Sequence, residues 1–294
     1  MIIDLHTHTF PDRIAASAVA GLQAACRTRA FSDGTAGGLR ASMDRSGVDC
    51  SVVLPVATSP RQVVHINDSA LRMNECFPES GLLSLGCMHP DFDGWREELD
   101  RIAERGLRGI KIHPAYQAVP LDDPRYLRIL DRAAQLGLVT VTHGGVDIGL
   151  PEPVLASPEM ACRVWRELGS IPLVLAHMGG WRQWDRAEEL LGETGFLLDT
   201  AFSFGPLTPA EGADFPPEER EMMGRAQFLR FVRTFGPRRI LFGTDSPWGD
   251  PAADLSRLQA LPIPEEDRAA ILGGNAARLL KLRPPAGKEE RRNS

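Results

Sequence analysis

The sequence predicts an α/β fold in which eight parallel strands alternate with helices. Short runs rich in apolar and β-branched residues recur along the chain, and stretches with helical periodicity separate them. Nearly continuous apolar character, rather than alternation with polar residues, is typical of parallel strands that are buried on both faces. The expected strands are residues 2–5, 50–55, 81–88, 109–113, 138–142, 172–176, 195–199 and 239–242.

Amphipathic stretches fill the segments between the expected strands. In residues 91–105, Trp95, Leu99 and Ile102 recur at helical spacing, and charged residues occupy most other positions. The same pattern recurs in three further stretches, each followed by a glycine: residues 124–136, 157–168 and 184–191. Glycine at that position favours helix termination, so we expect helices over these stretches.

Eight strands that alternate with helices form either a closed barrel or a doubly wound open sheet. No Gly-x-Gly-x-x-Gly motif follows an expected strand, so the main signature of a dinucleotide-binding open sheet is missing. The 294 residues also suit a single barrel, which typically needs roughly 250 residues. We therefore expect one (β/α)8 barrel domain over residues 1–282.

Two segments break the alternation of strands and helices. Residues 201–219 contain four prolines and several acids, show little periodicity, and follow the seventh expected strand. A segment in that position lies on the rim above the strand ends, so we expect a long loop or lid there. Residues 283–294 are rich in proline and charge, which predicts a frayed C-terminal tail.

The composition argues against several classes of partner. A net charge of -6 speaks against nucleic acid or an anionic membrane surface as the main partner. The sequence contains no run of about 18 apolar residues, which a membrane span requires, and no recognisable targeting segment. The five cysteines form no Cys-x-x-Cys pair, which predicts reduced thiols in a cytoplasmic protein.

Polar residues that can bind metals gather at the C-terminal ends of the expected strands. Six of the seven histidines lie there, together with a lysine and an aspartate. They are His6 and His8 (strand one), His89 (three), Lys111 and His113 (four), His143 (five), His177 (six) and Asp245 (eight). Because the C-terminal strand ends of a barrel form its catalytic face, we expect these side chains to converge.

His6 and His8 have a spacing that suits metal binding. Residues i and i+2 of a strand point to the same side, so both imidazoles can bind one cation. Lys111 and His113 share a side by the same rule. Imidazole nitrogens combined with a carboxylate suit a Zn²⁺-type ion and leave one coordination position open for water.

Each of these residues also has an ordinary structural explanation. A histidine pair in a strand is about as often a packing pair as a ligand pair. His177 can be a buried, hydrogen-bonded side chain, and Asp245 can cap the turn that follows it. Lys111 can pair with a carboxylate, contact substrate, or carry a CO₂-derived carboxylate that bridges two metals. The case for a metal site therefore depends on the strand ends taken together.

Several ordered motifs resemble those of the amidohydrolase superfamily. The resemblance is to the amidohydrolase-related group that includes aminocarboxymuconate-semialdehyde decarboxylase, and it runs from residue 2 to about residue 282. The motifs are Ile3-Asp4-Leu5-His6-Thr7-His8 with Phe10-Pro11, Gly109-Ile110-Lys111-Ile112-His113-Pro114, Val141-Thr142-His143-Gly144-Gly145, Leu175-Ala176-His177-Met178-Gly179-Gly180, Leu241-Phe242-Gly243-Thr244-Asp245-Ser246-Pro247 and Ile271-Leu272-Gly273-Gly274-Asn275-Ala276.

The resemblance implies a distorted (β/α)8 barrel with a divalent metal in its mouth. The implied ligands are His6, His8, His143 and Asp245, and the implied role of His177 is to orient or deprotonate a water molecule on the metal. In binuclear relatives a carboxylated lysine bridges a second metal, a role that Lys111 could fill. We expect a single Zn²⁺, with Mn²⁺ or Fe²⁺ as alternatives.

These residues predict an enzyme acting on a small molecule. Our main expectation is a hydrolase in which a metal-activated water attacks an ester, lactone or amide carbon. The expected catalytic residues are His177, Asp245, Lys111 and His113, and the expected substrate contacts are Arg182, Trp181 and His89. Non-oxidative decarboxylation of an unsaturated or aromatic acid is the alternative, disfavoured because this chain is shorter than many decarboxylases of the group. An inactive barrel that acts as a binding protein is a third possibility, and the group allows a homodimer.

Overall fold

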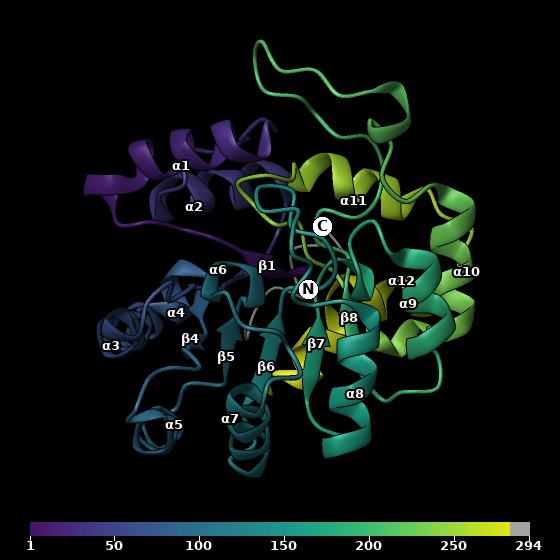
Figure 1. The fold of residues 1–294 in the computed structure, drawn as a ribbon. Helices are drawn as coiled ribbons and strands as arrows, with labels where there is room; N and C mark the ends of the chain where they lie inside the picture. Colours follow the sequence, from purple (N-terminus) through teal and green to yellow (C-terminus); the bar gives the residue numbers. More distant parts are fainter. Residues whose placement is uncertain (283–294) are drawn as a thin grey trace.

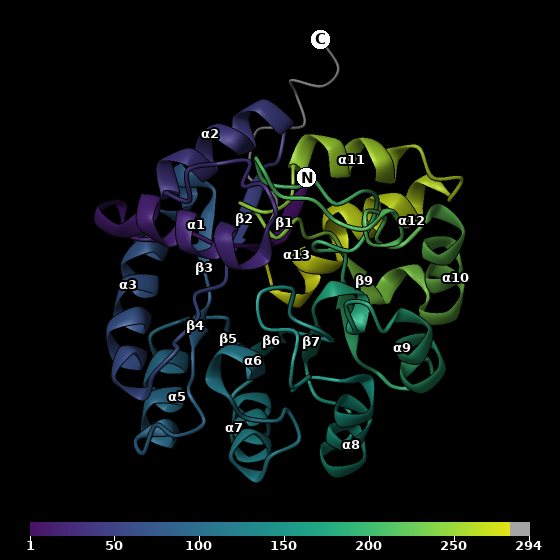
Figure 2. The ribbon, with the colours of Figure 1, turned by 45° about the horizontal axis from the view of Figure 1, so that its top comes forward.

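The computed structural model describes residues 1–282, so the expected tail at residues 283–294 lies outside the described residues. A ring of parallel strands occupies its centre, and helices surround it (Figures 1 and 2). The strands are β1 (Ile3–Thr7), β2 (Cys50–Val53), β3 (Leu82–Ser84), β4 (Gly86–Cys87), β5 (Gly109–Ile112), β6 (Val139–Thr142), β7 (Leu173–Leu175), β8 (Leu197–Asp199) and β9 (Ile240–Leu241). Their positions match the expected strands, and all neighbouring pairs are parallel.

The sheet closes on itself. The hydrogen-bonded order is β1-β2-β3 followed by β4-β5-β6-β7-β8-β9. The single strand expected over residues 81–88 is divided into β3 and β4 at Leu85, whose N–H still donates to the carbonyl oxygen of Val53 (3.0 Å). Leu5 N donates to Phe242 O (2.9 Å), which joins the segment after β9 to β1. The distorted (β/α)8 barrel predicted from the sequence is therefore confirmed.

Helices cover the outside of the barrel. The four expected helices are present, and the first begins at Trp95 rather than at residue 91. The full set is α1 (Asp12–Cys26), α2 (Ala36–Ser46), α3 (Val63–Glu75), α4 (Phe77–Ser80), α5 (Trp95–Glu104), α6 (Pro114–Gln117), α7 (Pro124–Gln135), α8 (Pro158–Leu168), α9 (Trp184–Leu191), α10 (Arg225–Phe235), α11 (Pro251–Gln259), α12 (Glu265–Ala269) and α13 (Asn275–Leu279). No helix of residues 1–282 is long and apolar enough to cross a membrane.

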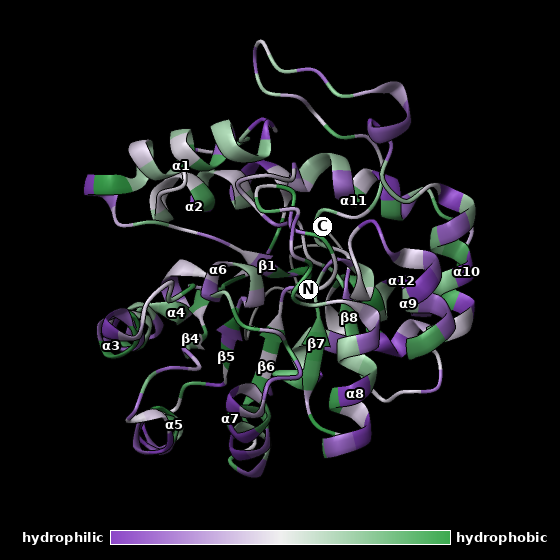
Figure 3. Ribbon diagram, viewed as in Figure 1, coloured by the Kyte–Doolittle hydropathy of each residue, from purple (hydrophilic) through white to green (hydrophobic). Residues whose placement is uncertain are grey.

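Hydrophobic residues fill both the barrel and the layer between strands and helices. Leu5, Val52, Val141 and Leu241 belong to a fully or almost fully buried cluster contributed by several strands. The strands are drawn mainly in green in Figure 3, while the outer helices carry more hydrophilic residues. This burial on both faces explains why the strands appear in the sequence as continuous apolar runs.

The segment between β8 and α10 contains the expected loop and rises at the top of Figure 1. It is anchored to residues 27–29 at the end of α1, because Arg29 N donates to Thr208 O and Ala210 N donates to Arg27 O, both at 2.9 Å. The Arg182 guanidinium, from the segment before α9, donates to the carbonyls of Glu219 and Glu221. The loop is therefore tied to two neighbouring segments.

Candidate active site

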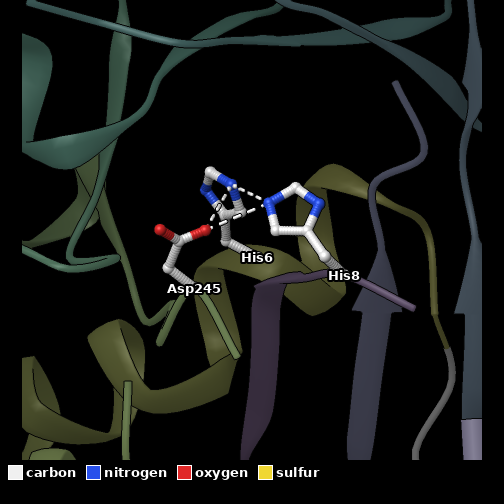
Figure 4. Close-up of side chains that lie close together, drawn as sticks. All are labelled: His6, His8 and Asp245. Atoms are coloured by element: carbon white, nitrogen blue, oxygen red, sulfur yellow. Dashed lines mark hydrogen bonds and ion pairs between the residues drawn. The ribbon is translucent and has the colours of Figure 1, made fainter. Parts of the chain in front are cut away.

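His6, His8 and Asp245 meet at the C-terminal end of the barrel. His6 lies in β1, His8 follows it by two residues, and Asp245 follows β9, which is the neighbour of β1. Figure 4 shows the three side chains pointing toward one another. Asp245 Oδ1 lies 3.0 Å from His8 Nε2 and 3.4 Å from His6 Nε2, and the two Nε2 atoms are 3.2 Å apart.

Hydrogen bonds to the far nitrogens determine which ring atoms face this centre. His6 Nδ1 is 2.8 Å from Asp199 Oδ2, and His8 Nδ1 is 2.8 Å from the carbonyl oxygen of Leu54. Both partners accept hydrogen bonds, so each neutral ring carries its proton on Nδ1 and presents a lone pair at Nε2. Two imidazole lone pairs and a carboxylate oxygen at these distances repel one another unless a cation lies between them. The donor set therefore fits a divalent metal.

His143 and His177 extend the group of imidazoles. Their ring centroids are 4.8 Å apart, and His177 lies 5.3 Å from His6. His177 Nδ1 is 2.8 Å from the carbonyl oxygen of Ala201, which leaves its Nε2 unprotonated in the neutral ring. His143 Nε2 is buried and has no hydrogen-bond partner in the structure. An unpartnered buried nitrogen is costly, so His143 is a suitable further ligand.

Burial keeps these imidazoles neutral. It lowers the pKa of His143 to about 3 and that of His177 to about 3, with the nearby positive charge of Lys111 acting in the same direction. Burial also lowers the pKa of His6 well below its usual value. Burial by itself raises the pKa of Asp245, but the contact with His8 and nearby positive groups bring it below its usual value. The site thus offers neutral imidazoles and an ionised carboxylate, the forms in which both bind metals.

Lys111 brings the principal positive charge of the barrel interior. Its side chain is 1% exposed, and Nζ lies 3.4 Å from His6 Nε2. Burial lowers its pKa to about 8, and Asp199 and Asp245 oppose that shift. At neutral pH the amine is therefore still mostly protonated. An ammonium this close to the metal-competent nitrogens is suited to an anionic substrate.

A second polar cluster lies beside the first. The rings of His113 and His143 stack with centroids 4.6 Å apart, and His113 Nε2 lies 3.6 Å from Asp147 Oδ2. Tyr116 N donates to His113 Nδ1 (3.4 Å), so the neutral ring of His113 carries its proton on Nε2. That tautomer donates a hydrogen bond and does not bind a metal. His113 therefore differs in role from His6, His8 and His143.

Both clusters line one cavity of about 850 Å³. The polar residues occupy one part of it. Most of the remaining wall is apolar, including Phe10, Trp181, Phe202 and Trp248. The volume is in the range of cavities that hold small-molecule ligands, which typically measure about 300–1,000 Å³.

Of the three expected substrate contacts, one lines the cavity and two do not. Trp181 lines the cavity and stacks with Phe202 at a centroid distance of 6.2 Å. Arg182 does not line it, because its guanidinium lies 4.8 Å from the Trp181 ring and binds carbonyls of the loop after β8. His89 does not line it either, since its Nδ1 accepts a hydrogen bond from Asp91 N (3.1 Å) in the turn after β4. We therefore do not assign Arg182 or His89 to substrate binding.

Two site residues were missed in the sequence analysis. Asp199 is the last residue of β8, and the strand-end rule that found Asp245 would have found it. Asp147 lies four residues beyond the strand-end residue His143, in an irregular segment. Its Oδ1 accepts hydrogen bonds from Gly149 N (2.9 Å) and Leu150 N (2.8 Å). No periodic signal marks such a residue.

The fold is similar to those of several solved decarboxylases. No curated protein matches the chain. 5-Carboxyvanillate decarboxylase from Sphingomonas paucimobilis is 20% identical, with a TM-score of 0.65 over 96% of this chain and 99% of that one. 2,6-Dihydroxybenzoate decarboxylase from Rhizobium is 18% identical, with a TM-score of 0.69 over 96% and 98%. 5-Carboxyvanillate decarboxylase from Novosphingobium aromaticivorans, in complex with manganese and a nitrobenzoic acid, is 14% identical, with a TM-score of 0.70 over 96% and 96%.

Identities this low establish similarity of fold and not of reaction. The family comparison is more direct. The model of the Amidohydrolase family matches residues 3–282, which is nearly the whole of the chain and all of the barrel. It includes every motif on which the resemblance was recognised in the sequence. The protein therefore belongs to the Amidohydrolase family.

Proposed function

We propose that the protein is a metal-dependent, non-oxidative decarboxylase of a small aromatic or unsaturated carboxylic acid. The observation that carries this proposal is the convergence of His6 Nε2, His8 Nε2 and Asp245 Oδ1 beside the Lys111 ammonium, within a cavity whose wall is largely apolar. A carboxylic acid can direct its charged end to this cluster of polar side chains and its carbon skeleton to the apolar wall.

The similar solved structures support decarboxylation over hydrolysis. The expectation of hydrolysis depends on this chain being shorter than the decarboxylases of the group. The chain covers 96–99% of the three similar decarboxylase chains, so it is not short beside them. One of those decarboxylases was solved with manganese, which makes Mn²⁺ the first metal to test and Zn²⁺ the second.

The proposed reaction replaces a carboxylate with a hydrogen atom. The bond between the carboxylate and the substrate carbon breaks, CO₂ leaves, and the bonding electron pair remains on the carbon, which then takes up one proton. A divalent ion held by His6, His8, His143 and Asp245 would stabilise negative charge on the substrate oxygens.

The chain's own residues hold the substrate and supply the proton in this proposal. Lys111 and the Nε2–H group of His113 bind the anionic end of the substrate. Asp245, which is ionised, and His177, whose Nε2 is unprotonated, are the groups that take up a proton from solvent water and pass it to the carbon that loses CO₂. The apolar wall excludes water and strengthens these electrostatic contacts.

The test is a substrate panel assayed on protein loaded with Mn²⁺ or Zn²⁺. The panel contains hydroxybenzoic acids together with esters, lactones and amides of similar size, and both CO₂ release and hydrolysis are measured. In D₂O, the proposal expects one deuterium on the carbon that lost its carboxylate. The double variant His6→Ala/His8→Ala is the control and should release no CO₂.

Three results would count against the proposal. Hydrolysis of an ester, lactone or amide without CO₂ release would favour the hydrolase expected from the sequence. CO₂ release that persists in the double variant would exclude a role for the metal. Failure to take up metal, together with no turnover of any compound, would favour an inactive barrel that binds ligands.

A further inference from the structure

Helix α1 forms one wall of the active-site cavity. Although it has fifteen residues and an apolar composition, only Ala15 and Cys26 are buried. Figure 3 shows most of α1 in pale and green colours, apart from its charged start. Its residues Ile14, Ala18 and Leu22, which share one face at a spacing of four, all line the cavity. The apolar face of α1 is therefore directed to the cavity rather than to a packed core.

Helix α3 supplies a matching wall. Its residues Ile66, Ala70 and Met73 also line the cavity and share one helical face. Both helices lie on the left side of the barrel in Figures 1 and 2, with α1 above α3. We call the part of the cavity lined by these two faces the α1–α3 arm. At 1.5 Å per residue, the lining stretch of α1 from Ile14 to Leu22 extends about 12 Å and that of α3 from Ile66 to Met73 about 10 Å, which is longer than one aromatic ring.

The arm leads from the catalytic cluster to the surface. At its inner end, a Cβ added to Gly149 would lie 3.7 Å from Ala25 Cβ and 3.4 Å from Asp147 Oδ1, so the end of α1 lies beside the second polar cluster. At its outer end, Ile14 is 43% exposed. On α3, Val64 is 41% exposed and precedes His65, which lines the cavity. Both helices therefore have an exposed apolar side chain at the surface end of the arm.

The charged groups of the cavity are distributed unevenly. Among the described residues that line it, the lysine and arginine side chains are those of Lys111 at the cluster and Arg13 at the exposed start of α1. Two polar side chains on the α3 side have hydrogen-bond partners. Ser69 Oγ donates to His65 O (2.9 Å), and Gln62 Oε1 accepts from Thr58 N (2.8 Å). A third, the imidazole of His65, lines the cavity and is exposed to solvent. Among the described residues, the arm thus contains no buried cation for a second carboxylate.

We propose that the substrate is a monocarboxylic acid with an extended apolar substituent, and that this substituent occupies the α1–α3 arm while the carboxylate lies at the cluster. The assignment rests on the proposed function, of which it specifies the substrate class. Continuity of the arm with the catalytic cluster within one cavity is the reason for choosing the substrate as its occupant.

A binding series tests the arm independently of turnover. The probes are 3-n-alkylphenols, from methyl to heptyl, titrated calorimetrically into the metal-loaded and the metal-free protein. Each methylene that enters the arm should tighten binding about fourfold, the factor that corresponds to burial of one CH₂ group. The gain should continue until the arm is filled.

Two matched tryptophan variants locate the binding. Ala18→Trp places an indole in the arm and should abolish the gain per methylene. Ala24→Trp, on the same helix but exposed and outside the cavity lining, should keep the wild-type series. A flat series in the wild type, as expected if α1 closes onto the barrel and fills the arm, would overturn the proposal. An unchanged slope in Ala18→Trp would do the same.

The binding series and the substrate panel together distinguish failure of this inference from failure of the proposed function. If the alkyl series shows the expected gain but no acid releases CO₂, the arm binds apolar groups and the proposed reaction is wrong. If hydroxybenzoic acids are decarboxylated while the alkyl series is flat, the proposed function stands and the substrate class inferred from the arm is wrong.

Discussion

Asp199 Oδ2 lies 2.8 Å from Nδ1 of His6, so a buried carboxylate at the end of β8 determines the tautomer of an imidazole on β1. The other oxygen of the carboxylate accepts hydrogen bonds from His177 N (2.9 Å) and Ala201 N (3.1 Å). Asp199 therefore connects the proposed metal ligand His6 with the backbone of His177. It acts on the site through these neighbours.

Replacing Asp199 with asparagine should weaken metal binding. The amide oxygen can keep the backbone hydrogen bonds, but the amide NH₂ group then faces His6 Nδ1 and favours the tautomer with its proton on Nε2. Loss of such a partner typically lowers metal affinity about 10–100-fold. Competition with a chromogenic chelator measures this change, and circular dichroism checks the fold. Equal affinity in the two proteins would show that Asp199 has no positioning role.

Replacing both His6 and His8 with alanine should abolish metal binding without unfolding the barrel. The hydrophobic core, not the metal site, contributes most of the stability, so the helical circular dichroism signal should remain. A metal that binds only the folded state raises stability, by about 2.7 kcal/mol at 100 times its Kd. Adding Mn²⁺ or Zn²⁺ should therefore raise the Tm of the chelator-treated wild type and leave that of the variant unchanged. Stoichiometric metal in the variant would exclude these ligands.

Replacing Lys111 with alanine tests the number of metals. We expect one equivalent of metal in both the wild type and the variant, together with a loss of turnover because the ammonium beside His6 is gone. Elemental analysis of both proteins gives the stoichiometry. Two equivalents in the wild type, falling to one or fewer in the variant, would mean that Lys111 bridges a second metal and that the single-metal prediction is wrong.

His143 should make the metal-free protein less stable in acid. The pKa of His143 is about 3 in the folded protein, whereas an exposed histidine in the unfolded chain has a pKa near 6.5. As the pH falls below 6.5 the unfolded chain takes up a proton that the folded protein does not, so stability decreases until the pH approaches 3.

The difference between wild type and His143→Gln isolates this contribution from those of the buried aspartates. Relative to the variant, the wild type should lose about 1–2 kcal/mol of unfolding free energy between pH 7 and pH 5. Urea unfolding of both metal-free proteins at each pH measures it. A difference that does not depend on pH would mean that His143 titrates normally in the folded state.

Asn67 should be important for stability because it joins α3 to β4 and α5. Its Oδ1 accepts from Cys87 N (2.7 Å), and its Nδ2 donates to Glu98 Oε1 (2.7 Å). Asn67→Ala leaves a buried N–H and a buried carboxylate without these partners, which should cost about 2–4 kcal/mol. Asp68→Ala, which removes a partly exposed ion pair with Arg101, should cost about 1 kcal/mol or less. Equal costs in denaturant unfolding would contradict this account.

Much of the fold could be predicted because its signals are local. Parallel strands buried on both faces give continuous apolar runs, and all eight runs became strand positions of the barrel. Their limits were less predictable. The run over residues 81–88 is divided at Leu85, and the helix expected from residue 91 begins at Trp95 after a turn. Such boundaries depend on hydrogen bonds to neighbouring segments.

The sequence by itself determined which strand ends carry polar residues, and barrel closure makes strand ends converge wherever the strands lie in the chain. Only the tertiary structure decided where those side chains point. His177 and Asp245 have positive φ values, 58° and 63°, so the alternation rule for strands does not apply to them. Arg182 binds the loop after β8, and Asp199 of β8 contacts His6 of β1, which lies two strands further along the sheet. These contacts join residues distant in the sequence, and no local periodicity encodes them.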